Sequence, residues 1–382
     1  MAELRSRIDA VRAQMERDGI DVCVISENPN IMWLTGFERV FDDEPAHRLI
    51  ISADRTVIFS DSRYADALNR AAVLAHEADA HVNWEIDTIR GSLSHRCTAL
   101  IAEMNAQVVA VEDTMTIGEY RAWEKSFKDA GVTAELREVS RYVLNLRAVK
   151  TADEIKALKA AQAITDAAFA HICEYLTDAY RVRGEALTER TVQLELDNTM
   201  RMMGAEDLAF DTIMASGANA AAPHSIPGEK VIEEGDMIVM DFGARLNGYH
   251  SDMTRVVCIG DPGEKARHAF ATIRRANEEV EAMLKPGVIG LDAHNLAEDV
   301  LAQEGFGGCM GHSLGHGVGL VIHEQPTLSP VNDKPLQIGN VVTVEPGIYI
   351  SGEFGCRLED CGVITQDGFE VFTQSPHELV II

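Results

Sequence analysis

Apolar residues recur at two different spacings in the first part of the chain, and together they predict an α/β domain. The first stretch repeats apolar side chains at helical spacing and then reaches a glycine: Leu4, Ile8, Val11, Met15 and Gly19. Four short apolar runs have the length of buried strands: residues 20–25, 49–51, 56–60 and 108–111. The triplet Asn28-Pro29-Asn30 is expected to break the chain after the first strand. Because helical stretches separate the strands, residues 1–140 are predicted to form one small α/β domain.

A second domain is predicted over residues 150–382. Thr151 and Glu154 have the spacing of a capping box, which predicts the start of a long helix. Further helices are expected over residues 188–203, 263–284 and 292–303, and strands from residue 210 and again from residue 338. The order of two helices followed by strands therefore occurs twice, which indicates an α+β domain.

Two segments of this second domain share one pattern and suggest an internal duplication. Residues 235–243 and 339–347 both read Gly, Asp or Asn, four mostly apolar residues, an acid, any residue and Gly. Each segment supplies one acid, and a second acid follows on a strand-like run: Asp241 with Asp252, and Glu345 with Glu359. We therefore predict a duplicated unit folded about a pseudo-twofold axis, in which the four carboxylates converge from opposite halves.

Charge and cysteine content exclude several classes of partner and site. The formal net charge is −27, so the phosphate backbone of a nucleic acid would be repelled. No apolar stretch is long enough to span a membrane, and the charged first residues lack the apolar core of a signal peptide, which predicts a cytoplasmic location. The seven cysteines include no Cys-x-x-Cys pair, and no second pair complements Cys356 and Cys361, so free thiols are expected.

Four acids at matched positions on apolar strands need a common positive charge, because buried carboxylates repel one another. Between the two acid pairs, the glycine-rich residues 311–324 carry His312, His316 and His323, and the glycine content predicts a loop leading into a strand. His224 precedes the first acid pair as His323 precedes the second, and is the predicted counterpart of His323. Carboxylates and imidazoles without thiolates suit a pair of Mn²⁺, Co²⁺, Fe²⁺ or Zn²⁺ ions, which could support the hydrolysis of a stable amide.

Several of these segments resemble the creatinase/aminopeptidase P/prolidase family, the pita-bread metallopeptidases. The resemblance rests on DFG with Asp241, SDMTR with Asp252, GHGVGLVIHE over 315–324, VEPGIY with Glu345 and RLED with Glu359. It extends through FDTIMASGANAAAPH over 210–224 and LRAVKTADEI over 146–155, with a weaker likeness in NPNIMWLTGF over 28–37. It implies a small N-terminal creatinase-like α/β domain and a C-terminal pita-bread domain with an internal pseudo-twofold repeat.

The family's pattern, carried onto the matching positions of this chain, implies a metal centre. Five side chains would hold two divalent ions: Asp241, Asp252, His316, Glu345 and Glu359. In that pattern Asp252 and Glu359 bridge the ions. Asp241 completes one ion, and His316 with Glu345 completes the other. Mn²⁺ is the first expectation for the metal, with Co²⁺, Zn²⁺ or Fe²⁺ as alternatives.

The resemblance assigns further roles around that centre. Glu345 resembles the family's proton shuttle, which takes a proton from water and passes it to the leaving nitrogen. Three outer histidines would contact the substrate and the developing oxyanion: His224, His312 and His323. Arg357 and Thr254 lie where they could orient the bridging carboxylates.

The resemblance also implies a substrate and an oligomeric state. Peptidases of this two-domain form cleave the bond between an N-terminal residue and proline, whose amide has no N–H. The family's N-terminal domain usually makes dimer contacts and restricts the entrance, which implies a homodimer that takes small peptides. A dipeptidase needs a group for the proline carboxylate, and the candidates are Arg39, Arg48 and Ser313. The acidic run Asp42-Asp43-Glu44 is either a solvated loop or an edge of the entrance.

Other functions are compatible with the same fold. They are a metal-dependent hydrolase of another small amide, a metal-independent enzyme of the creatinase kind, and a non-catalytic binding module. A metal-independent enzyme would have lost ligands, whereas all five ligand types are present. A binding module would also carry charged tails, which are not seen. The sequence therefore predicts a Xaa-Pro dipeptidase or a Xaa-Pro aminopeptidase.

Overall fold

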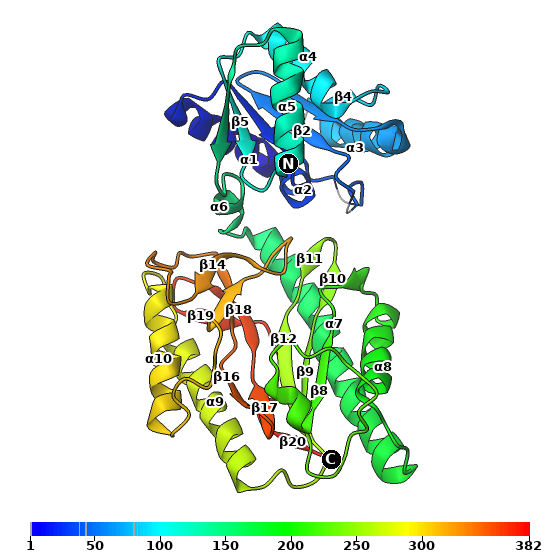
Figure 1. Cartoon of the computed structure of the whole chain (residues 1–382), viewed down its shortest axis with the longest axis vertical. Coiled ribbons are helices and arrows are strands. Elements are labelled where there is room, and N and C mark those ends of the chain that lie inside the picture. Colours follow the sequence, from blue (N-terminus) through cyan, green and yellow to red (C-terminus); the bar gives the residue numbers. More distant parts are fainter. Residues whose placement is uncertain (1, 38, 43, 79–80, 82) are drawn as a thin grey trace. The chain divides into compact units, whose positions relative to one another are not determined.

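The computed structural model describes residues 2–37, 39–42, 44–78, 81 and 83–382 (Figure 1). The chain divides into two compact units, residues 1–147 and residues 148–382. Asp43 of the acidic run lies outside the described residues. Among the helices described, none combines the length and the apolar character that a bilayer span requires.

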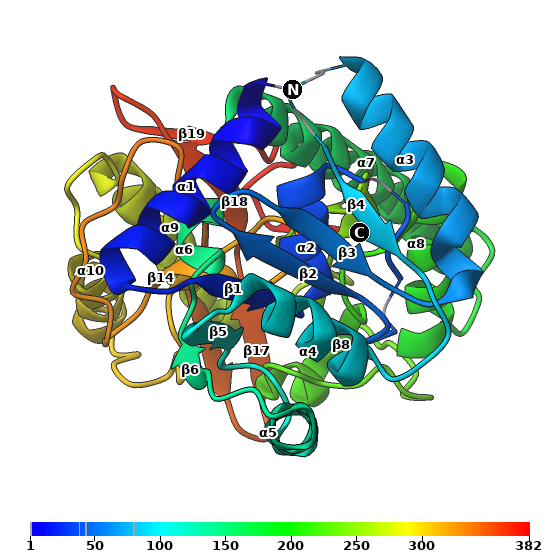
Figure 2. The same ribbon diagram turned by 90° about the horizontal axis from the view of Figure 1, so that it is seen from above.

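Unit 1 is built on a six-stranded mixed sheet with the order β4-β3-β2-β1-β5-β6, seen from above in Figure 2. Its strands are β1 (Val22–Ile25), β2 (Arg48–Ser52), β3 (Thr56–Phe59), β4 (Glu85–Asp87), β5 (Val108–Glu112) and β6 (Glu135–Val139). Strand β2 is antiparallel to both β1 and β3, whereas β5 is parallel to both β1 and β6. The predicted α/β class of this unit is confirmed.

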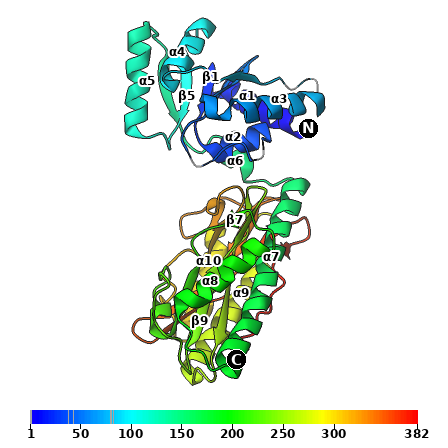
Figure 3. The same ribbon diagram turned by 90° about the vertical axis from the view of Figure 1, so that its right-hand side faces the viewer.

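Helices cover both faces of this sheet (Figure 3). They are α1 (Ala2–Asp18), α2 (Asn28–Thr35), α3 (Ala65–Ala78), α4 (Leu93–Met104), α5 (Ile117–Ala130) and α6 (Leu144–Arg147), with the 3-10 turn η1 (Ser62–Tyr64). Helices α4 and α5 bury Ile101 and Trp123 against one face of the sheet. Strand β1 ends before the Asn28-Pro29-Asn30 triplet, as expected, and the triplet forms the first turn of α2. Proline is accepted there because the first turn of a helix needs no N–H partner.

Unit 2 contains two halves with the same order of elements. The first half has α7 (Ala152–Leu176), the π-helical turn η2 (Thr177–Val182), α8 (Glu189–Met202), β7 (Asp207–Leu208), β8 (Ile213–Ser216), η3 (Gly217–Ala221), β9 (Met237–Phe242), β10 (Ala244–Leu246), β11 (Tyr249–His250) and β12 (Met253–Cys258). The second half has α9 (Glu264–Met283), α10 (Gly290–Gln303), β13 (Gly315–Gly317), β14 (Glu324–Leu328), β15 (Val341–Val344), β16 (Gly347–Ile350), β17 (Phe354–Arg357), β18 (Asp360–Ile364), β19 (Phe369–Val371) and β20 (Val380–Ile381).

The two halves also pair their strands in the same way. Strand β9 is antiparallel to β12 with the hairpin β10/β11 between them, and β15 is antiparallel to β18 with the hairpin β16/β17 between them. In Figure 1 helices α7 and α8 flank one side of these strands, and α9 and α10 flank the other. The predicted α+β unit with an internal repeat is therefore confirmed.

The start of α7 has the predicted capping box. The backbone N–H of Glu154 donates to Thr151 Oγ1 at 3.4 Å, and the backbone N–H of Thr151 donates to Glu154 Oε2 at 2.9 Å. Each side chain thus satisfies a donor that the first helical turn leaves without a partner.

Candidate metal centre

Strand geometry places the two acids of the first half on one face of the sheet. In β9, Ile238 packs into the core below α7 and α8, whereas Val239 joins the core of the second half. Because side chains alternate along a strand, Asp241 points to the same face as Val239. Strand β12 sets Thr254 opposite Asp241, and Asp252, two residues earlier, shares the face of Thr254. Both acids therefore face the second half of the unit.

The second half brings its acids to the ends of the matching strand pair. Glu345 directly follows β15, and Glu359 directly precedes β18. His316 lies in β13, where its backbone N–H donates to Thr343 Oγ1 at 3.1 Å, and the same hydroxyl donates to Glu345 Oε1 at 3.3 Å. Gly315 allows this approach, because a Cβ there would lie 2.0 Å from the Thr343 carbonyl oxygen. The glycine-rich segment is non-helical, as predicted, and includes this short strand.

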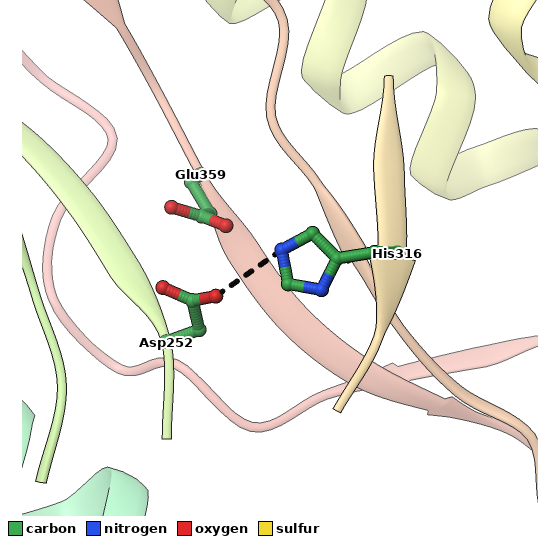
Figure 4. Close-up of side chains that lie close together, drawn as sticks. All are labelled: Asp252, His316 and Glu359. Atoms are coloured by element: carbon green, nitrogen blue, oxygen red, sulfur yellow. Dashed lines mark ion pairs between the residues drawn. The ribbon is translucent and has the colours of Figure 1, made fainter. Parts of the chain in front are cut away.

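The two halves bring three of the predicted ligands into immediate proximity (Figure 4). One ligand atom each from Asp252, His316 and Glu359 lie within 4.8 Å of one another. His316 Nε2 is 3.4 Å from Asp252 Oδ2 and 3.5 Å from Glu345 Oε1. All five predicted ligands, Asp241 and Glu345 included, line one cavity of about 700 Å³. The cavity is thus bounded by acids from both halves of the repeat.

Burial and mutual repulsion perturb the pKa values of these acids. Burial, together with the charges of Asp241 and Glu345, raises the pKa of Asp252 well above its usual value. Burial and the charge of Asp252 raise the pKa of Glu359 in the same direction. Burial raises the pKa of Glu345 to about 8. Such a site favours either protonated carboxyl groups or a cation that the carboxylates share.

The orientation of His316 fits a shared cation. Burial lowers the pKa of His316 to about 4, so the imidazole is neutral near pH 7. Its Nδ1 is 3.0 Å from the Gly317 carbonyl oxygen, which can only accept, so Nδ1 carries the proton. The lone pair of Nε2 therefore points at the carboxylates of Asp252 and Glu345, an arrangement that a metal ion would stabilise.

Two carboxylate oxygens give the same indication. Among the described residues, Asp241 Oδ1 and Glu359 Oε1 are buried and have no hydrogen-bond partner. A buried carboxylate oxygen without a partner is costly unless a cation binds it. Carboxylate oxygens with one imidazole form a donor set that suits Mn²⁺, Fe²⁺, Co²⁺ or Zn²⁺. The residues present therefore fit a bound divalent metal.

Arg357 and Thr254 hold the acids in a different way from the prediction. Thr254 Oγ1 donates to Glu359 Oε2 at 2.7 Å, which agrees with a role in orienting this acid. Arg357 Nη2, however, donates to Asp241 Oδ2 at 2.5 Å, and Arg357 Nε donates to Thr254 Oγ1 at 3.0 Å. Arg357 therefore contacts a predicted bridging carboxylate only through Thr254, because the β17 side chain reaches across to β9. Its third contact, from Nη1 to the Tyr349 hydroxyl at 2.7 Å, involves a residue that the sequence did not single out.

The three outer histidines all line the cavity, but His312 differs from the other two. His312 Nδ1 is 2.7 Å from the Ser313 carbonyl oxygen, and His312 Nε2 is 3.0 Å from the Tyr349 hydroxyl. Both ring nitrogens of His312 are thus engaged within the protein, and it is linked to Arg357 through Tyr349. His323 packs edge-on against His316, with ring centroids 4.4 Å apart. Tyr349 lies inside the VEPGIY motif, which was the one signal that could have pointed to it.

The remaining sequence predictions concern Arg48, Ser313 and the cysteines. Arg48 is not available to a substrate carboxylate, because its buried guanidinium pairs with Glu119 within unit 1. Ser313 lines the cavity. The cysteines are free, as predicted, and Cys356 and Cys361 are both buried. The cavity is also lined by residues outside the quoted motifs, Arg190, Gln193 and Ile226, and by Phe210 and Asp211 at the start of FDTIMASGANAAAPH.

Removal of His323 is expected to leave the metal ions in place and to lower kcat. Burial lowers the pKa of His323, so it is a neutral donor in the cavity, whereas His316 is the predicted ligand. We expect His323→Ala to retain the metal content of the wild type and to lose about 10²-fold in kcat, the effect of losing one oxyanion donor. Metal analysis and steady-state kinetics test this, with the exposed His268→Ala as the control. Loss of metal from His323→Ala would show that the inner ligands are wrongly assigned.

A duplicated α+β unit with a carboxylate–histidine cluster between its halves defines the protein as a metallopeptidase of the pita-bread class. The chain belongs to metallopeptidase family M24, whose model matches residues 156–366. Residues 7–149 match the creatinase/prolidase N-terminal domain.

Comparisons with individual proteins agree with this family. A solved Xaa-Pro dipeptidase from Bacillus anthracis is 35% identical, with a TM-score of 0.89, over 99% of this chain and 100% of that one. An X-Pro aminopeptidase structure from Thermotoga maritima is 32% identical, with a TM-score of 0.81, over 97% of this chain and 100% of that one. A Xaa-Pro dipeptidase from Pyrococcus furiosus is 36% identical over 72% of this chain and 76% of its own length.

Proposed function

We propose that the protein is a dinuclear-metal-dependent peptidase that cleaves the bond between an N-terminal residue and proline. The observation that carries the proposal is that Asp252, His316 and Glu359 lie together, beside carboxylate oxygens that have no hydrogen-bond partner among the described residues. The proposed substrate class is supported by similarity to proteins described as Xaa-Pro dipeptidases and as an X-Pro aminopeptidase.

Five side chains would hold the two divalent ions, with Mn²⁺ the first expectation: Asp241, Asp252, His316, Glu345 and Glu359. When bound, such ions lower the pKa of water and polarise a carbonyl group. The chain's own contribution is to hold the acids in place. Arg357 holds Asp241, and Thr254 holds Glu359, by direct hydrogen bonds. This preorganisation limits the cost of assembling four like charges.

Glu345 is the proposed proton carrier. Burial raises the pKa of Glu345 to about 8, and Thr343 Oγ1 donates to its Oε1 at 3.3 Å, which orients the carboxyl group. A carboxylate held beside the attacking water can accept its proton and give it to the leaving nitrogen. The proline nitrogen has no hydrogen in the amide, so it leaves as a secondary amine only when it receives this proton.

His224 and His323 are the proposed contacts of the scissile carbonyl oxygen. Both line the cavity, and burial keeps the His323 imidazole neutral. A neutral imidazole can donate one N–H to the developing oxyanion without adding a charge beside the metal ions. The two engaged nitrogens of His312 favour a role in supporting Tyr349 and Arg357.

The cavity wall supports recognition of a proline ring. Apolar side chains line one part of the cavity: Phe210, Ile213, Pro223, Ile226 and Ile322. A volume of about 700 Å³ holds a dipeptide or a tripeptide. A compact ring with no N–H suits such a wall, because it leaves no donor unsatisfied there.

Hydrolysis of matched peptides tests the proposed function. Metal-free enzyme is reloaded with Mn²⁺ or Zn²⁺ and offered a Xaa-Pro dipeptide, the Xaa-Pro-Xaa tripeptide and, as a control, the dipeptide with alanine in place of proline. Cleavage of only the Xaa-Pro dipeptide identifies a dipeptidase, and cleavage of the tripeptide identifies an aminopeptidase. If two ions bind and neither proline peptide is cut, the peptidase assignment fails, and another small amide becomes the candidate substrate. A homodimer and a cytoplasmic location remain predictions.

A further inference from the structure

The first turn of α8 contains a buried carboxylate outside the metal centre. Glu189 is 0% exposed, and its Oε1 accepts from the Ser216 backbone N–H at 2.7 Å, from Ser216 Oγ at 2.9 Å and from Asn219 Nδ2 at 3.1 Å. Its Oε2 accepts from the Gly228 backbone N–H at 3.2 Å and from Asn219 Nδ2 at 3.2 Å. In the described part of the chain, no Lys, Arg or His forms an ion pair with it. A buried carboxylate of this kind owes its stability to its hydrogen bonds.

These donors lie at the two ends of one chain segment, residues 217–228. Ser216 ends β8, which is an edge strand in the order β20-β12-β9-β8, so its N–H would otherwise lack a ladder partner. Gly228 is at the opposite end, where its carbonyl oxygen also accepts from the Arg190 backbone N–H at 3.0 Å. Glu189 therefore joins the outgoing and returning ends of the segment to the start of α8.

The segment between these ends forms a wall of the cavity. Five consecutive residues line it: Pro223, His224, Ser225, Ile226 and Pro227. Two of them are prolines and offer no N–H to hold the backbone. Within this stretch the Ser225 N–H donates to the Ala222 carbonyl oxygen at 3.1 Å, which is a local turn. Its attachment to α8 is at the last residue, where the Pro227 carbonyl oxygen accepts from Arg190 Nη2 at 3.5 Å. The position of His224 thus depends on how the two ends are held.

We propose that Glu189 is a positioning residue of the peptidase: its carboxylate fixes both ends of segment 217–228 and so sets the place of His224 beside the metal centre. The inference rests on the proposed function, and in particular on the role of His224 at the scissile carbonyl. A carboxylate is needed because both of its oxygens accept hydrogen bonds, so one can serve the donors at Ser216 while the other serves the donor at Gly228. A glutamine would present an NH₂ group to N–H donors at one end.

The test compares Glu189→Gln with Glu195→Gln, in the wild-type and His224→Ala backgrounds. Glu195 is the matched control, because it lies on the same helix and, among the described residues, bonds only the partly exposed His171, at 2.7 Å. We expect E189Q to keep its metal content and to lose up to about 10²-fold in kcat/KM on a Xaa-Pro peptide, as for displaced catalytic groups. In the His224→Ala background, E189Q should cost no more than a few-fold further. E195Q should match its parent in both backgrounds.

Equal losses from E189Q in the two backgrounds would overturn the proposal, because Glu189 would then act through the general stability of the fold. Wild-type kcat/KM in E189Q would overturn it as well. Hydrogen exchange gives a readout that does not need activity: amides of residues 217–228 should exchange faster in E189Q than in E195Q, and unchanged exchange contradicts the proposal. If the wild type cuts no Xaa-Pro peptide, the proposed function fails, and this exchange measurement still decides the role of Glu189. If E189Q does not fold, Asn219→Ala takes its place, because it removes one donor to Glu189 at the β8 end of the segment. We expect its loss of kcat/KM to be smaller than that of E189Q and to be non-additive with His224→Ala. Additive losses would count against the proposal.

Discussion

Replacement of Glu359 by glutamine is expected to abolish metal-dependent activity while leaving the metal-free fold at least as stable as the wild type. Glu359 Oε2 accepts from Thr254 Oγ1, and glutamine keeps an oxygen for that bond. Its Oε1 has no partner in the described structure, and an amide NH₂ in its place removes a ligand atom. Because a bound metal contributes several kcal/mol of charge stabilisation to the transition state, we expect kcat/KM to fall by about 10³-fold or more.

The expected effect on stability has the opposite sign. The charges of Asp252, Glu345 and Asp241 all raise the pKa of Glu359, so the metal-free wild type has unfavourable repulsion that glutamine removes. The Tm of metal-free E359Q should therefore equal or exceed that of metal-free wild type. Added Mn²⁺ should raise the Tm of the wild type and have little effect on the variant.

Metal analysis, thermal unfolding with and without Mn²⁺, and peptide hydrolysis measure these effects. Glu353→Gln is the control, because Glu353 is half-exposed between β16 and β17 and pairs with Lys265. An E359Q enzyme that binds two ions and cleaves peptide at the wild-type rate would refute the bridging role. A metal-free variant that is much less stable than the wild type would show that Glu359 supports the fold.

Lys150→Met is expected to lower the free energy of unfolding of unit 2 by about 3–5 kcal/mol, the cost of leaving one buried charge without its partner. Lys150 Nζ lies 2.7 Å from Glu324 Oε1, and both side chains are 1% exposed. The Lys150 backbone N–H also donates to the Gly339 carbonyl oxygen at 2.8 Å. Glu324 follows His323 directly at the start of β14, so the loss should extend to the histidines of the site.

Two further variants make this prediction specific. The double variant Lys150→Met/Glu324→Met should recover most of the stability, because two apolar side chains leave no uncompensated charge. Lys159→Met is the surface control, since its pair with Glu370 is 40% and 53% exposed and should contribute less than about 1 kcal/mol. A K150M effect as small as that of K159M would contradict the prediction.

The choice of probe matters for this measurement. All three tryptophans lie in unit 1: Trp33, Trp84 and Trp123. Tryptophan fluorescence therefore reports the unfolding of unit 1 and not the effect of Lys150. Hydrogen exchange of the β13 and β14 peptides, with circular dichroism as a function of urea, reports on unit 2 directly.

Local patterns in the sequence were enough to predict the elements and much of the site's composition. The capping box of Thr151 and Glu154, four of the six strands of unit 1 and the non-helical glycine-rich segment depend on residues close together in the chain, and the structure agrees with these predictions. The two edge strands β4 and β6 were not predicted. The repeat of an acid after each apolar strand also follows from local order, because strand periodicity decides which face the acid occupies.

The contacts between distant side chains could not be predicted in this way. Arg357 bonds Asp241 across 116 residues, and the sequence placed it beside the bridging acids instead. Arg48 was predicted as a candidate for binding the substrate carboxylate, but in the structure it pairs with Glu119. No sequence motif pointed to the hydrogen bonds of Glu189.

By itself, the sequence determined the element order and the duplication, which follow from periodicity and motif spacing. The resemblance of its motifs to a known family implied the family and the candidate ligands. Only the tertiary structure decided which carboxylate Arg357 and Thr254 each bind and which histidine nitrogens have no partner within the described protein. It also decided which segment forms the cavity wall. The physical reason is that such contacts depend on strand register and on the packing of two halves about one cavity. A change of one residue in register turns a side chain to the opposite face, whereas the local pattern that forms the strand stays the same.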